Sequence, residues 1–167
     1  MEKKIYTATD LVRILGISRD QYKNWLMQGY IKPSIRKSSG PGKKNEFSRY
    51  DLYAIGLFQE LVAKGFPREQ ASSQTQKIAR RLKTGMKERW LRAEYVAFYL
   101  NGKTGKNASS SGKVGMITID VDNKINGDSY NSKVNFNELN ILEDNENETV
   151  LLINFRVLRE KINNKLR

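Results

Sequence analysis

The sequence predicts an α+β protein made of two modules, and three observations lead to this class. The first half contains three helix-start patterns, each followed by apolar residues at helical spacing. The second half contains runs that are rich in β-branched and aromatic residues. Positive charge is concentrated in the first half. We therefore expect residues 1–85 to form a mostly helical domain with a small β-hairpin, and residues 86–167 to form a small α+β domain.

The charge of the chain favours a polyanionic partner. Its 167 residues contain 30 Lys and Arg against 18 Asp and Glu, a formal net charge of +12. Residues 1–85 hold 17 of these basic and 7 of these acidic residues, so the first half supplies most of the positive charge. Such an excess is typical of nucleic-acid binding. An anionic membrane surface is the other partner that this charge allows.

The composition also narrows the chemistry. Histidine and cysteine are absent, which removes the commonest general base, the commonest metal ligand and any thiolate site. We therefore expect no enzyme activity, no metal and no cofactor. No apolar run approaches the ~18 residues that span a bilayer, so no membrane association is expected. The expected location is the cytoplasm, on the bacterial nucleoid.

Three short patterns predict where helices begin. Residues 7–10 (TATD), 18–21 (SRDQ) and 48–51 (SRYD) each place a hydroxyl residue three positions before an acid or amide. This is the spacing of a capping box, in which each side chain bonds the backbone amide of the other residue. A fourth helix is expected between Pro67 and Gly85, which suit a helix start and a helix stop.

The first two helices are separated only by Gly16-Ile17-Ser18, the spacing of a helix-turn-helix. The second helix of such a unit lies in the major groove, with its first residues at base edges. Tyr22, Trp25 and Leu26 are expected to face the domain, although the two aromatic residues could instead stack on bases. The candidate DNA contacts in this helix are Arg19, Gln21, Lys23 and Asn24, of which Arg19 and Lys23 are expected to be the principal ones. For Gln21, helix capping alone is an equal alternative.

Residues 32–47 (KPSIRKSSGPGKKNEF) predict a basic hairpin, or wing, beside this unit. Two strand-capable pieces, residues 34–37 and 44–47, flank a Gly-Pro-Gly tip. The candidate phosphate contacts are Arg36, Lys37, Lys43 and Lys44. The alternatives are a disordered basic loop or a surface whose charge only aids solubility.

The order of these parts resembles the MerR-type winged helix-turn-helix of bacterial transcription regulators. The matching stretches are YTATDLVRILGIS, GYIKP, FSRYDLYAIGLFQELVAKGF and Trp25, within residues 6–71, about 40% of the chain. The family's Thr, Arg and Glu in the recognition helix are here Gln21, Lys23 and Leu26. The resemblance implies a winged DNA-binding domain. The long dimerisation helix that usually follows in this family is not found in residues 86–100.

The second half predicts three strands and a helix. Residues 94–101 and 113–121 are expected to pair, on either side of a flexible loop at 102–112. Residues 149–155 are apolar on both sides, as in a buried central strand. Asn126-Gly127 is a turn signal. A terminal helix is expected, with one face formed by Phe155, Leu158, Ile162 and Leu166.

Acidic residues in the second half suggest one further possibility, a metal site. Asp120, Asp122 and Asp128 do not have the spacing of a calcium-binding loop. A two-metal nuclease could use such carboxylates, but solvated acids at strand ends are the favoured interpretation.

The leading functional hypothesis is a sequence-specific double-stranded DNA-binding protein, a bacterial transcription regulator that acts as a homodimer. A small-molecule or protein effector is conceivable, and no residues point to one. The first alternative is an excisionase-like architectural factor of a phage or mobile element, which would bend DNA. Less favoured alternatives are a nucleic-acid-processing enzyme and an adaptor that uses the C-terminal domain. The second module is expected to serve dimerisation, partner docking or ligand sensing.

Overall fold

The computed structural model describes residues 5–40, 42–83, 91, 93–101, 113–120, 124–127, 133–135 and 147–166. The chain is mixed α+β, as expected, and divides into two compact units. The first unit comprises Met1–Lys87 and Leu158–Arg167, and the second comprises Glu88–Val157. No helix in these described ranges is long and apolar enough to cross a membrane.

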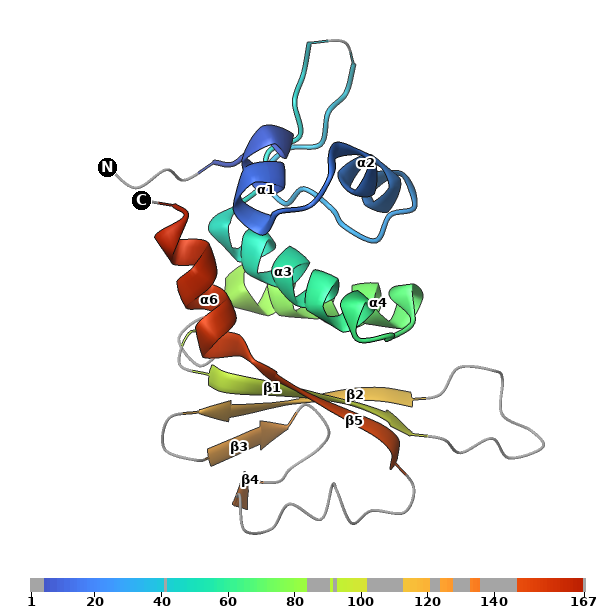
Figure 1. The fold of residues 1–167 in the computed structure, drawn as a ribbon, viewed down its shortest axis with the longest axis vertical. Coiled ribbons are helices and arrows are strands. Elements are labelled where there is room, and N and C mark those ends of the chain that lie inside the picture. The colour runs from blue at the N-terminus through green and yellow to red at the C-terminus, as the bar shows by residue number, and fades with distance from the viewer. Residues whose placement is uncertain are drawn as a thin grey trace, which may run out of the picture. The chain divides into compact units, whose positions relative to one another are not determined.

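Four helices lie in the described part of the first unit that comes from the N-terminal half of the chain (Figure 1). They are α1 (Ala8–Leu15), α2 (Arg19–Met27), α3 (Arg49–Ala63) and α4 (Arg68–Lys83). Gly16 adopts a left-handed conformation, with φ of 70°, and ends α1 at the predicted turn. Helix α3 is the centre of the unit, because every residue from 51 to 58 is buried.

The three predicted helix starts are confirmed. The Gln21 side-chain oxygen accepts the Ser18 N–H at 2.8 Å, and Ser18 Oγ accepts the Gln21 N–H at 3.0 Å. Ser48 and Asp51 form the same reciprocal pair at the start of α3. At α1, the Asp10 carboxylate accepts the Thr7 N–H at 2.8 Å. These bonds satisfy amides that no helical carbonyl can reach.

The second unit contains the β-sheet. Its described strands are β1 (Ala93–Asn101), β2 (Lys113–Asp120), β3 (Lys124–Gly127), β4 (Lys133–Asn135) and β5 (Asn147–Asn154). Their order is β4-β3-β2-β1-β5, and all four pairings are antiparallel. The predicted pairing of the first two strands is confirmed, with Tyr99 opposite Gly115.

Two predictions about the sheet are wrong. Strand β5 stands at the end of the described strand order rather than at its centre. Its Leu152 is 50% exposed while Ile153 is buried, so an apolar run did not mean burial on both faces. Asn126-Gly127 belongs to β3, opposite Thr118 and Ile117, and is not a turn. The predicted loop at 102–112 and the acids Asp122 and Asp128 lie outside the described residues.

The terminal helix also differs from the expected domain division. Helix α6 (Phe155–Asn164) follows β5 directly, and from Leu158 onward the chain belongs to the first unit. Gly56 of α3 makes room for it: a Cβ at this position would lie 3.1 Å from Ile162 Cδ1 and 3.4 Å from Leu158 Cδ1. The apolar pattern predicted a helix face, but it could not show that this face packs on α3.

Polar contacts fix the end of α6. The Asn163 side-chain oxygen accepts from Arg49 Nη2 at 2.8 Å and from the Tyr53 hydroxyl at 2.7 Å. Lys165 Nζ donates to the Ile14 carbonyl at 3.0 Å, and Arg13 donates to the Lys165 carbonyl at 3.2 Å. Residues near the C-terminus therefore complete the first unit.

We expect the Asn163→Ala substitution to lower the free energy of unfolding by about 1–3 kcal/mol, because it removes an acceptor shared by Arg49 and the buried Tyr53. Asn164→Ala, at the exposed neighbouring position, is the control and is expected to have little effect. Urea denaturation of the full chain measures both. Equal stabilities of the two variants would contradict the proposed packing of α6.

Candidate nucleic-acid interface

Helix α2 has one buried side and one exposed side. Tyr22 and Trp25 are buried and Leu26 is half-buried, so the predicted inward-facing residues are confirmed. At about 100° per residue, the positions opposite Tyr22 and Trp25 are Asp20 and Met27. Lys23 and Asn24 flank these two positions. We call these four exposed residues the outer face of α2: Asp20, Lys23, Asn24 and Met27.

Two of the predicted contact residues lie outside this face. Arg19 is exposed, but it does not lie opposite the core. It projects from the side of the helix, about 90° around the axis from the direction of Asp20 and Met27. Gln21 lies at the other side, and its oxygen holds the Ser18 amide in the cap. The alternative role considered for Gln21 is therefore present. The candidate contacts selected from the sequence include neither Asp20 nor Met27, although helical periodicity alone places both outward.

Aromatic packing holds α2 in place. The rings of Trp25 and Phe58 meet edge to face, with centroids 5.0 Å apart. Tyr30, just beyond α2, stacks on the same Phe58 ring at 5.9 Å. Phe58 is fully buried and Trp25 is 6% exposed. Trp25 is consequently a core residue and is not available to stack on a base.

Helix α4 anchors the chain where it leaves α2. Ser72 Oγ donates to the Tyr30 carbonyl at 2.8 Å, and Gln76 Nε2 donates to the Gly29 and Tyr30 carbonyls at 3.1 and 3.2 Å. The Tyr30 hydroxyl donates to Glu69 at 2.8 Å, and this bond raises the pKa of the hydroxyl. Sequence reasoning missed this anchor, because a polar helix stripe does not reveal which backbone carbonyls it will meet.

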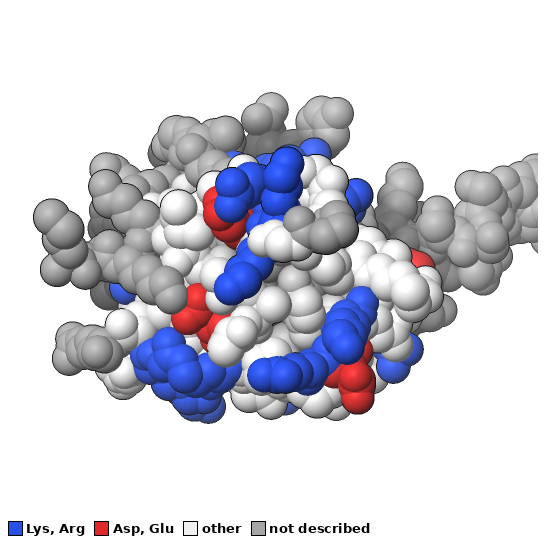
Figure 2. All heavy atoms as spheres, turned by 90° about the horizontal axis from the view of Figure 1, so that it is seen from above, with Lys and Arg blue, Asp and Glu red and all other residues white. Residues whose placement is uncertain are grey.

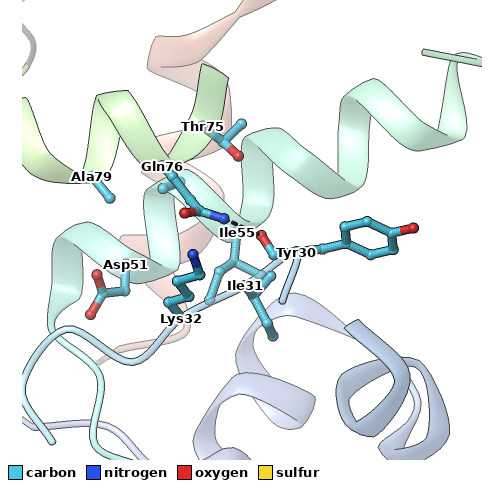
Figure 3. A pocket seen from close by; sticks show the side chains of 9 residues that line it. Tyr30, Ile31, Lys32, Asp51, Ile55, Thr75, Gln76 and Ala79 are labelled. Carbon is cyan, nitrogen blue, oxygen red and sulfur yellow. Dashed lines mark hydrogen bonds between the residues drawn. The ribbon is translucent and has the colours of Figure 1, made fainter. Parts of the chain in front are cut away.

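A small open hollow, with a volume of about 20 Å³, lies between this segment, α3 and α4 (Figure 3). Lys32 reaches along it toward Gln76, whose side chain turns back to the Tyr30 carbonyl, and the Tyr30 ring points away. Asp51, at the rim, is 2% exposed and accepts hydrogen bonds from the Ser48 amide and the Ser34 hydroxyl. These polar groups hold residues 29–34 on α3 and α4.

The predicted wing forms a loop with one β-bridge at its base. We call residues 34–47 the wing loop. Arg36 and Glu46 exchange backbone hydrogen bonds, and their side chains form an ion pair. The two predicted strand pieces therefore shorten to bridges, with Phe47 pairing to Tyr6 instead. The Ser38 hydroxyl donates to the Lys43 carbonyl at 2.7 Å and closes the loop.

The basic side chains of the wing loop differ in availability. The Arg36 guanidinium is engaged with Glu46, which reduces its value as a phosphate contact. Lys37, Lys43 and Lys44 are exposed. Within the described residues, no acidic side chain forms an ion pair with these three lysines. The wing loop thus presents three ammonium groups to solvent.

The wing loop is attached to α2. Asn45 Nδ2 donates to the Tyr22 hydroxyl at 3.3 Å, and the Tyr22 ring meets Phe47 edge to face at 6.2 Å. Burial raises the pKa of the Tyr22 hydroxyl, so it stays a neutral partner. One residue on the buried side of α2 therefore fixes the base of the wing loop beside the helix.

Figure 2 looks down on the side of the first unit that carries α1, α2 and the wing loop. Lys and Arg side chains are spread across this side, with fewer acidic side chains visible among them. The arrangement can contact a polyanion at several points at once.

No protein-family model matches the sequence, and a search of curated proteins finds no significant match.

We expect Tyr22→Phe to lower the free energy of unfolding by about 1 kcal/mol and to accelerate tryptic cleavage after Lys43 and Lys44, because the hydroxyl that tethers the loop is lost. Asn45→Ala is the partner variant in a double-mutant cycle. The double variant is expected to cost less than the sum of the two single changes. Strict additivity would show that the two side chains do not interact.

Proposed function

We propose that the protein is a non-enzymatic, sequence-specific double-stranded DNA-binding protein with a MerR-like winged helix-turn-helix. The observation that carries this proposal is the pairing of α2 with the wing loop through Tyr22 and Asn45. A helix with a largely polar outer face and a loop with exposed lysines are thereby held side by side. In the proposed complex, the outer face of α2 enters the major groove while the wing loop lies along the phosphates.

The charge distribution supports this assignment. The outer face of α2 carries one lysine and one acid, so it has little net charge. The wing loop carries Lys37, Lys43 and Lys44, whose flexible ammonium groups suit phosphate oxygens. In the proposed complex, sequence-independent affinity comes mainly from the loop, whereas base selection comes mainly from α2.

We further propose a bacterial transcription regulator that binds as a homodimer. A nine-residue helix reads too few base pairs to specify a unique genomic site, so a second copy is needed. The second unit is the proposed dimerisation module. In the proposed dimer, two copies of α2 meet half-sites one helical turn apart, or a multiple of it.

Selection of bound sequences from random duplex DNA tests the proposal. We expect a preferred site with two inverted half-sites. Lys23→Ala is expected to cost about 1–3 kcal/mol per half-site and to relax preference at one base pair of each half-site, as the loss of a base-reading residue does. Arg19→Ala, at the side of the helix, is expected to weaken all duplexes about equally. Absence of any selected sequence, with the fold intact, would refute sequence-specific binding.

The Lys43→Ala/Lys44→Ala double variant tests the wing loop. We expect weaker binding to every duplex and a slope of log K against log salt reduced by roughly 2 for each bound protomer, since each phosphate contact contributes about 0.9. Lys77→Ala/Lys161→Ala is the matched control, because it removes the same charge from exposed positions on α4 and α6. An equal change of slope in both variants would show that net charge matters and the wing loop does not.

A further inference from the structure

Met27 is an apolar side chain in an unusual place. It is 78% exposed, whereas the other large apolar side chains that are exposed among the described residues range from 37% to 50%. It is the last residue of α2. On the outer face it lies about one turn beyond Lys23 and Asn24. The other exposed residues of α2 are polar or charged: Arg19, Asp20, Gln21, Lys23 and Asn24.

The fold gains little from this methionine. At 78% exposure its thioether chain buries almost no surface, so its contribution to the hydrophobic core is small. Solvent therefore meets a flexible apolar group at the C-terminal end of an otherwise polar helix face. A single exposed apolar residue is ordinary on a protein surface, so the position of Met27 on the outer face of α2, and not its exposure alone, makes it a candidate contact.

From this placement we propose that Met27 contacts the 5-methyl group of a thymine and thereby selects a T·A base pair at one position of each half-site. This inference rests on the proposed DNA-binding function. Thymine is the base that offers an apolar group in the major groove. A methionine has three rotatable bonds and adapts to such a small apolar surface.

The neighbouring groups favour DNA over a protein partner. Lys23 lies one turn before Met27, and the Tyr22 contact to Asn45 holds the lysine-bearing wing loop beside the same helix. An apolar protein surface that docked on Met27 would also face these cations. A phosphate-lined groove supplies both the negative charge and the methyl group.

The test replaces thymines in the selected duplex, one at a time, by deoxyuridine, which lacks only the 5-methyl group. We expect the unaltered protein to bind about fourfold more weakly when the thymine is replaced at one particular position of either half-site. That factor corresponds to the ~0.8 kcal/mol of one buried methyl group. Met27→Ala is expected to bind thymine and deoxyuridine duplexes equally. Met27→Leu, which keeps an apolar side chain, is the matched control and is expected to retain most of the preference.

The outcomes separate this inference from the proposed function. Thermal melting of the variants checks the fold, which the exposed position of Met27 predicts to be unchanged. A protein that selects no duplex sequence refutes the proposed function itself. Specific binding without a thymine preference, or a preference that survives in Met27→Ala, overturns the role of Met27 and leaves the proposed function standing.

Discussion

The contact between Trp25 and Phe58 determines what α2 can present to a partner. The two rings meet edge to face with centroids 5.0 Å apart, and Tyr30 covers Phe58 from the segment after the helix. A contact of this kind is worth about 0.5–1.5 kcal/mol beyond the area that it buries. Because Trp25 points inward, helical periodicity directs Asp20 and Met27 outward. The chemistry of the outer face is therefore a consequence of the core.

Hydrogen bonds then limit the freedom of that helix at both ends. The capping pair of Ser18 and Gln21 fixes its first turn, and Ser72 and Gln76 hold the carbonyls just beyond its last turn. A binding surface whose backbone is already ordered loses less conformational entropy on association. The same reasoning applies to the wing loop, since Asn45 ties its base to Tyr22. Order in the free protein thus favours a specific complex.

Local chemistry was predictable from the sequence, and long-range partners were not. Capping boxes join residues three positions apart, so Ser18 with Gln21 and Ser48 with Asp51 identified both helix starts. Inward-facing Tyr22 and Trp25 followed from periodicity. The docking of α6 on Gly56 depends instead on residues more than 100 positions away. Likewise, β5 stands at the end of the described strand order because β1 is its single described neighbour. An apolar sequence does not show how many neighbours a strand will have.

Asp20, on the outer face of α2, gives a physical reason for the proposed difference between the two elements, in which the wing loop supplies affinity and α2 selects bases. Asp20 interacts favourably with the positive end of the helix dipole, but its charge repels phosphates. In the proposed complex it therefore lowers the affinity of α2 for any duplex in which the carboxylate lacks a donor. A cytosine amino group in the groove removes part of that penalty. Because specificity is a difference between affinities, a carboxylate that weakens most complexes and spares a few increases selectivity, provided that the wing loop supplies the attraction.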